Sequence, residues 1–95
     1  MFVLALDIDL HLPECRSLKA KRAVLRPVVE GARRRFGVAA SEVGRNDQWQ
    51  RARVGVAAVG GTESHVRDVI DEVERWVWSQ PGVEVLSMER TWLDT

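Results

Sequence analysis

The sequence predicts an α+β sandwich, in which two helices cover one face of a four-stranded antiparallel sheet. Three observations predict this fold. Apolar and polar residues alternate over 2–12, which is the period of a strand with one face on a core. Two longer segments, 17–36 and 62–79, repeat apolar residues at helical spacing. The other apolar segments are short and bounded by turn residues, which is typical of strands.

The first predicted helix, 17–36, has the reverse of the usual charge order. Ser17 suits the N-cap, and Gly37 suits a C-terminal stop. The first turns are crowded with cations, although free backbone N–H groups already form a positive pole there. Its basic residues are Lys19, Lys21, Arg22, Arg26, Arg33, Arg34 and Arg35. Pro27 interrupts the helix interior and should bend it.

The rest of the chain predicts a hairpin, a second helix and a last strand. The hairpin pairs 38–43 with 49–59 across the polar turn GRNDQ. The second helix, 62–79, begins with the acid that a helix start favours, Glu63. In the last strand, 83–92, the apolar residues change parity, and a β-bulge would reconcile the way they face.

The order of elements, β-α-β-β-α-β, is typical of a ferredoxin-like βαββαβ sandwich with strand order 4-1-3-2. We expect it to span the whole chain, 1–95, as one domain. The start of the first helix and the turn between the second and third strands then share one edge of the sheet. The residues gathered at that edge are His11, Glu14, Cys15, Arg16, Lys19, Lys21, Arg22, Arg45, Asp47, Trp49 and Arg51.

The positive helix pole and the basic side chains at this edge predict an anion site. The candidate residues for binding an anion or nucleic acid are Ser17, Lys19, Lys21, Arg22, Arg26, Arg45, Trp49 and Arg51. Lysine and arginine neutralise phosphates, and an aromatic ring can stack on a splayed base. The alternative is a solvated helix face, whose long side chains cover the apolar rim.

No set of catalytic residues is evident, so the sequence predicts a protein that is not an enzyme and holds no cofactor. A metal bound by Asp7, Asp9 and His11 is disfavoured, because alternate side chains of a strand lie ~7 Å apart. Asp7 and Asp9 instead share their face with two arginines of the adjacent strand, and cross-strand ion pairs explain them. These arginines are Arg51 and Arg53.

The composition is that of a globular chain, with 45% hydrophobic and 29% charged residues and zero formal net charge. Zero net charge weighs against nucleic acid, but the basic residues concentrate in one segment. The one cysteine, Cys15, fits a reducing compartment, and neighbouring cations could lower its pKa. The N-terminus lacks the basic region of a signal peptide, and no segment is apolar enough to span a bilayer. We expect a cytoplasmic protein without membrane contact.

The segments SLKAKRAVLRPV and RRRFGVAASEVGRNDQWQRARVGVAAVG resemble the YlxP-like family of small bacterial proteins of unknown function. The resemblance covers most of the chain and is most specific over 17–60. Gly37 departs from it, because the family tends to have Asn there. The resemblance implies a ferredoxin-like fold and no established activity. It also implies a connection to RNA or the ribosome, because members are often encoded among translation and ribosome-maturation genes.

The sequence therefore predicts an RNA- or ribosome-associated binding module that uses the first helix and the adjoining turn. The alternative is a homodimeric protein-interaction or small-ligand-binding module that uses the open face of the sheet. That face would carry a small, flat patch formed by Val3, Ala5, Gly55 and Ala57.

Overall fold

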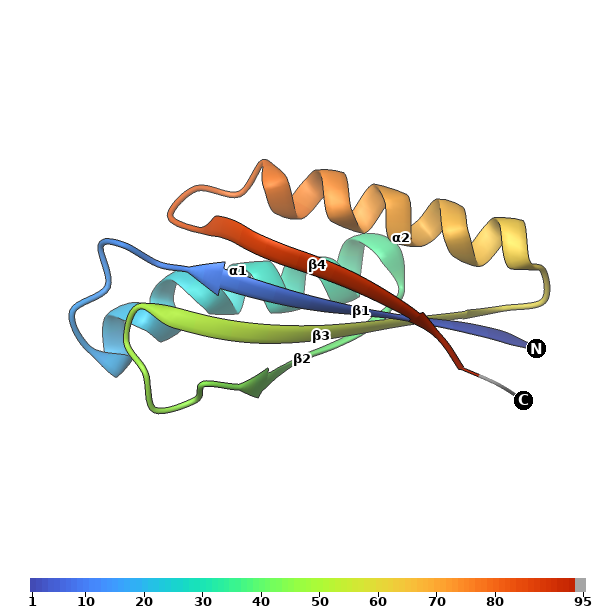
Figure 1. Cartoon of the computed structure of the whole chain (residues 1–95). Coiled ribbons are helices and arrows are strands. Elements are labelled where there is room, and N and C mark those ends of the chain that lie inside the picture. The colour runs from blue at the N-terminus through green and yellow to red at the C-terminus, as the bar shows by residue number, and fades with distance from the viewer. Residues whose placement is uncertain (94–95) are drawn as a thin grey trace.

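The computed structural model describes residues 1–93 and has the predicted order of elements (Figure 1). The elements are β1 (Phe2–His11), α1 (Leu18–Phe36), β2 (Ala39–Gly44), β3 (Arg51–Gly60), α2 (Glu63–Trp78) and β4 (Glu84–Trp92). Each begins and ends within two residues of its predicted bounds. Neither helix is long and apolar enough to cross a membrane, among the residues described.

The four strands form one antiparallel sheet in the order β2-β3-β1-β4. Counted from the other edge of the sheet, this is the predicted order 4-1-3-2, so the prediction is confirmed. Figure 1 shows both helices on the same side of this sheet. α1 packs on the β2 side, whereas α2 packs on β1 and β3. The opposite side of the sheet, which carries Asp7, Asp9 and Ala57, is called the open sheet face below.

The core lies between the sheet and the helices, and the period of the strands decides which residues enter it. The alternate residues Leu4, Leu6, Ile8, Leu10 and Leu12 are all buried. They meet Val66, Ile70, Val73 and Val77 of α2 and Leu25, Val28 and Ala32 of α1. Fully burying one such aliphatic side chain contributes about 1.5–3 kcal/mol, so this layer supplies most of the favourable free energy of folding.

Both helices begin with the predicted caps. The Ser17 hydroxyl accepts a hydrogen bond from the Ala20 N–H at 3.0 Å, and the Thr62 hydroxyl accepts one from the His65 N–H at 3.3 Å. α1 ends at Gly37, whose φ of 63° is the left-handed conformation that favours glycine. Pro27 lies inside α1 without ending it. The reversed charge order of α1 is therefore a property of one continuous, capped helix.

The predicted bulge in the last strand is present at Leu86. The β1–β4 register passes from Asp9 opposite Ser87 to Leu10 opposite Val85, which leaves Leu86 as the extra residue. The bulge lets Val85 and Met88 both pack against the core. The structure has a second bulge, at Val43 of β2, that the sequence analysis did not predict.

The two helices approach closely where Gly31 of α1 faces Trp76 of α2. A Cβ atom at Gly31 would lie 2.5 Å from Cη2 of the Trp76 ring, which is closer than non-bonded carbon atoms allow. The same ring meets Phe36 edge-on, with 5.9 Å between the ring centroids. Gly31 is therefore required by the contact between the helices rather than by the local conformation of α1.

Candidate anion-binding surface

The arginines of the open sheet face are engaged by aspartates, as predicted. Arg51 Nη2 donates to Asp9 Oδ2 at 2.8 Å, and Arg45 Nε lies 3.3 Å from Asp9 Oδ1. Arg53 forms hydrogen bonds to both carboxylate oxygens of Asp7, and these bonds lower the pKa of Asp7. Cross-strand ion pairs therefore account for Asp7 and Asp9, and the two predicted site residues Arg45 and Arg51 already have an anionic partner.

Lys21 does not lie on the surface with the other predicted site residues. Its side chain is 2% exposed, and its Nζ lies 2.7 Å from Glu42 Oε2. The same ammonium donates a 2.7 Å hydrogen bond to the Arg45 carbonyl. An external anion cannot replace these contacts without breaking a buried ion pair. The prediction that Lys21 contacts a bound anion is corrected: Lys21 fixes the β2–β3 turn against α1.

Helical spacing explains why Lys21 is buried. It lies four, seven and eleven residues before the buried residues Leu25, Val28 and Ala32, so it occupies the inward face of α1. Charge alone places Lys21 with Lys19 and Arg22 among the predicted anion-binding residues. Its position on the apolar stripe was the signal that would have separated it from them, since a buried lysine requires an acidic partner.

The β2–β3 turn is held from two sides through Arg45. The φ of Arg45 is 59°, a left-handed conformation that costs about 1–2 kcal/mol in a residue with a side chain. Lys21 binds its carbonyl, and Asp9 binds its guanidinium. The turn lies in the predicted polar segment GRNDQ, and its left-handed residue is Arg45.

Trp49 projects from this turn and is 53% exposed. Its neighbour Gln50 accepts a hydrogen bond from the Leu12 N–H at 2.9 Å. The Gln50 side-chain amide also donates to the Pro13 carbonyl at 3.3 Å. These bonds hold the turn against the loop between β1 and α1. Trp49 therefore lies at the end of the sheet where α1 begins, as the predicted topology requires.

Cys15 is buried in this loop, with 2% of its surface exposed. Burial raises the pKa of its thiol, and the nearby Lys21 ammonium only partly opposes this effect. The lowered pKa considered from the sequence is therefore wrong. The buried thiol packs as a small apolar side chain.

The basic residues divide sharply between paired and unpaired groups. Of the 14 lysines and arginines, six form ion pairs with carboxylates, and eight form none among the described residues 1–93. The eight are Arg16, Lys19, Arg22, Arg26, Arg33, Arg34, Arg35 and Arg75. All except Arg75 belong to α1 or to the residues just before it. The unpaired positive charge is therefore concentrated on one helix.

Two adjoining depressions follow the outer side of α1. The larger, of about 450 Å³, is called the basic groove; it is lined by Lys19, Arg22, Ala23, Arg26, Pro27, Glu30 and Arg34. The smaller, of about 210 Å³, lies between α1 and β2 and adds Arg33 and Ser41. Arg22 and Arg26 line both depressions. Arg33 is held there by a 2.9 Å hydrogen bond from its Nε to the Ala40 carbonyl.

The eight predicted site residues thus fall into four groups. Lys19, Arg22 and Arg26 lie together in the basic groove. Ser17 is engaged as the N-cap, and Trp49 is exposed in the turn. The remaining residues, Lys21, Arg45 and Arg51, have intramolecular partners. Two further arginines, which were not among the predicted site residues, line the depressions. Arg34 lines the basic groove, and Arg33 lines the smaller depression.

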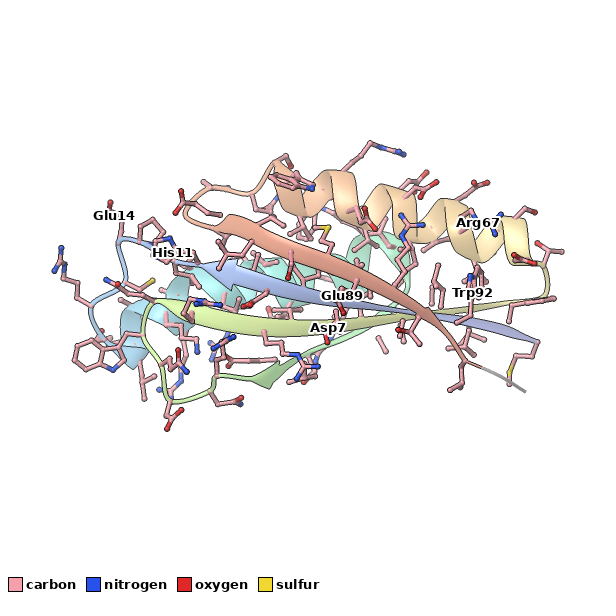
Figure 2. The ribbon with its side chains drawn as sticks, in the orientation of Figure 1. Asp7, His11, Glu14, Arg67, Glu89 and Trp92 are labelled. Carbon is pink, nitrogen blue, oxygen red and sulfur yellow. The ribbon has the colours of Figure 1, made fainter. Side chains whose placement is uncertain are left out.

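The part of the chain that the structure describes contains no group of three or more His, Cys, Asp or Glu side chains that could hold a metal ion. His11 Nδ1 lies 2.6 Å from Glu84 Oε1, and Figure 2 shows His11 near the end of the sheet where β1 ends.

Fold and surface together define the class: a small ferredoxin-like α+β protein with one basic helix surface. The chain belongs to the family described as "Protein of unknown function (DUF503)", which matches residues 3–90. It is 34% identical over 76 residues to the "Uncharacterized protein YlxP" of Bacillus subtilis (strain 168), covering 80% of this chain and 83% of that protein. These matches confirm the resemblance found in the sequence.

A solved structure is also similar to the chain. The solution NMR structure of the de novo designed protein LFR1 1, with a ferredoxin fold, aligns with a TM-score of 0.49 and 14% identity. The alignment covers 100% of this chain and 88% of the designed one. The fold assignment itself rests on the order of the elements and on the order and direction of the strands.

Proposed function

We propose that the protein is a cytoplasmic, non-enzymatic module that binds RNA or an RNA surface of the ribosome through the phosphate backbone. The observation that carries the proposal is the set of unpaired cations along α1. Outside α1, five of the seven arginines have a carboxylate partner among the described residues. A row of cations kept free of such partners, beside a groove, suits a polyanion.

The proposed contact residues are Lys19, Arg22, Arg26, Arg33 and Arg34. Trp49, exposed near the start of α1, is proposed to stack on an unpaired base. Ser17 supports the site only through the N-cap. Glu30 lies among the cations and opposes an anionic ligand. If three or four single-strand phosphates are neutralised, the logarithm of affinity should fall with the logarithm of salt concentration with a slope of about −2 to −3.

The experiment is a fluorescence titration of labelled single-stranded RNA at several salt concentrations. Wild type is compared with Arg22→Glu, with Lys19→Glu/Arg22→Glu and with Arg75→Glu. Arg75 is a matched control because it is exposed and unpaired but belongs to α2. We expect Arg22→Glu to weaken binding about tenfold or more and to make the salt slope shallower by about one. Salt-independent binding, or equal losses for Arg22→Glu and Arg75→Glu, would contradict the proposal.

The open sheet face favours a second candidate, a homodimer. It carries a shallow depression of about 410 Å³ lined mainly by small residues of the three strands β1, β2 and β3, including Ala5, Gly55 and Ala57. Arginines and aspartates balance each other beside it, so the face attracts a second copy of itself better than a polyanion. Four strands ~4.8 Å apart and up to ~33 Å long offer roughly 600 Å². This approaches the ~800 Å² per partner of a standard interface.

Figure 2 shows Glu89 beside Asp7 on this face, where the two residues are directly opposite in the β1–β4 register. Like charges in this arrangement are unfavourable, and a second copy could supply an arginine to Glu89. Sedimentation velocity of wild type and Ala57→Arg tests the candidate. Ala23→Arg is the control, because it adds the same side chain to the helix side. Dimers lost only in Ala57→Arg support this candidate; a monomeric wild type at high concentration excludes it.

A further inference from the structure

Pro27 gives α1 a feature that the charge pattern alone does not explain. In a continuous helix the N–H of residue 27 would donate to the carbonyl of Ala23, four residues earlier. Proline has no N–H, and its ring pushes against that carbonyl. α1 nevertheless continues through Pro27 to Phe36. The Ala23 carbonyl is therefore a hydrogen-bond acceptor without its usual helical donor.

The residue that carries this acceptor lines the basic groove. Ala23 and Pro27 are both exposed and both line the depression of about 450 Å³. Lys19 precedes Ala23 by one helical turn, and Arg22 and Arg26 occupy the adjacent row. The groove thus presents one backbone acceptor and one carboxylate, that of Glu30, among side chains that otherwise only donate hydrogen bonds. Phosphate oxygens suit the cations but are repelled by the carbonyl.

A ligand that satisfies both kinds of group must carry a hydrogen-bond donor close to its phosphates. We propose that the Ala23 carbonyl accepts a hydrogen bond from a ribose 2′-hydroxyl, so that the groove prefers RNA to DNA. The 2′-hydroxyl is the donor next to the backbone that DNA lacks. This inference rests on the proposed function and deepens it, because it names the feature by which the same site distinguishes two polyanions of equal charge.

The probes are single strands of about twelve nucleotides in three forms: oligouridine, oligodeoxyuridine and 2′-O-methyl oligouridine. All three carry the same base and the same charge. The deoxy form lacks the 2′-oxygen, and the methylated form keeps the RNA-like sugar shape but cannot donate. One neutral hydrogen bond is worth about a two- to tenfold preference, so oligouridine should bind that much more tightly than either of the other two.

Pro27→Ala tests the carbonyl itself. Alanine restores an N–H donor at position 27 and is the residue most favourable to a helix, so the variant should fold. We expect Pro27→Ala to lose the preference for oligouridine, measured as the ratio of the variant's own affinities for oligouridine and oligodeoxyuridine. Pro81→Ala is the matched control, because Pro81 is exposed outside α1 and the basic groove. It should keep the wild-type preference.

The outcomes separate this inference from the proposed function. Equal binding of all three strands by wild type, with the expected salt slope, overturns the role of the hydroxyl and leaves RNA binding in place. Equal binding of the ribose and methylated strands, both tighter than the deoxy strand, overturns it in favour of sugar shape. An undiminished preference in Pro27→Ala overturns the role of the Ala23 carbonyl. No binding of any strand at low salt overturns both proposals.

Discussion

The two helices cover the same face of the sheet but treat their charges in opposite ways. α2 begins with Glu63, which pairs with Arg67 at 2.6 Å, and its carboxylates Asp71 and Glu74 both bind Arg90 of β4. Arg67 also lies over the Trp92 ring, as Figure 2 shows. α1 has no acid in its first turn, and its surface cations form no ion pairs among the described residues. The difference separates a helix that pairs four of its seven charged side chains within the fold from one whose surface cations form no ion pairs among the described residues.

The charge order of α1 is tolerable because its free-energy cost is small. Each exposed cation near a helix start opposes the dipole by only a few tenths of a kcal/mol, and Arg33, Arg34 and Arg35 favour the opposite end. Burial of Leu25, Val28 and Ala32 outweighs this cost. The unpaired cations on the surface of α1 therefore cost too little free energy to destabilise the fold.

The largest expected effect concerns the one basic residue of α1 that is paired. Glu42→Gln would leave the buried Lys21 ammonium without its counter-charge and should lower the free energy of unfolding by about 1–3 kcal/mol. Glu30→Gln makes the same chemical change on the exposed side of α1, where Glu30 has no ion pair within residues 1–93, and should change it by less than about 0.5 kcal/mol. Urea unfolding measures both. Equal effects would show that the buried pair does not hold the β2–β3 turn.

The next effect tests the contact between the two helices. Gly→Ala inside a helix usually stabilises by about 0.5–1 kcal/mol. At Gly31 the added carbon would enter the space of the Trp76 ring, so Gly31→Ala should instead destabilise by about 1–3 kcal/mol. Gly61→Ala is the control, since a Cβ there meets nothing within 4 Å. Thermal unfolding decides the sign, and a stabilised Gly31→Ala protein would refute the close approach of the helices.

A smaller effect sharpens the contrast in surface charge. Glu30→Gln removes the one acid of the basic groove and should strengthen RNA binding about two- to fivefold at low salt, with a steeper salt dependence. Glu72→Gln removes an exposed acid of α2 and should have a lesser effect, because Glu72 is not in the groove. Titration with the same labelled RNA compares them. Equal gains would mean that only net charge matters.

The smallest effect is the pH dependence of the open sheet face. Hydrogen bonds from Arg53 lower the pKa of Asp7 below its ordinary value. Such a carboxylate stabilises the fold above its unfolded pKa of about 4, and this contribution disappears as the pH falls through the lower folded pKa. The urea midpoint of wild type should therefore fall more steeply below pH 4 than that of Asp7→Asn. Asp68→Asn, which changes an exposed acid of α2, should keep the wild-type slope.

The sequence predicted what local periodicity determines. The alternation over residues 2–12 placed five leucine and isoleucine residues in the core, and the change of parity in β4 predicted the bulge at Leu86. The caps Ser17 and Thr62 were also readable from the chain. These features depend on a few consecutive residues, so they could be predicted before any tertiary contact was known.

The candidate site could be predicted only in part, because ion pairing is a tertiary property. Lys19, Arg22 and Arg26 were correctly placed on one surface of α1. The helical spacing of Lys21 indicates burial, but its partner Glu42 lies on another element. No local pattern shows that Arg45 shares Asp9 with Arg51 of β3. Charge shows where cations are concentrated, whereas the fold decides which of them remain free for a ligand.

The most direct test of the central claim is to map RNA binding on the molecule by NMR. Oligouridine is titrated into isotope-labelled protein, and the chemical-shift changes of the backbone amides are followed residue by residue. The account predicts saturable changes concentrated in α1 between residues 19 and 34, with α2 unaffected and only the turn around Trp49 joining them. Changes centred on the open sheet face or on α2, or no changes at low salt, would contradict it.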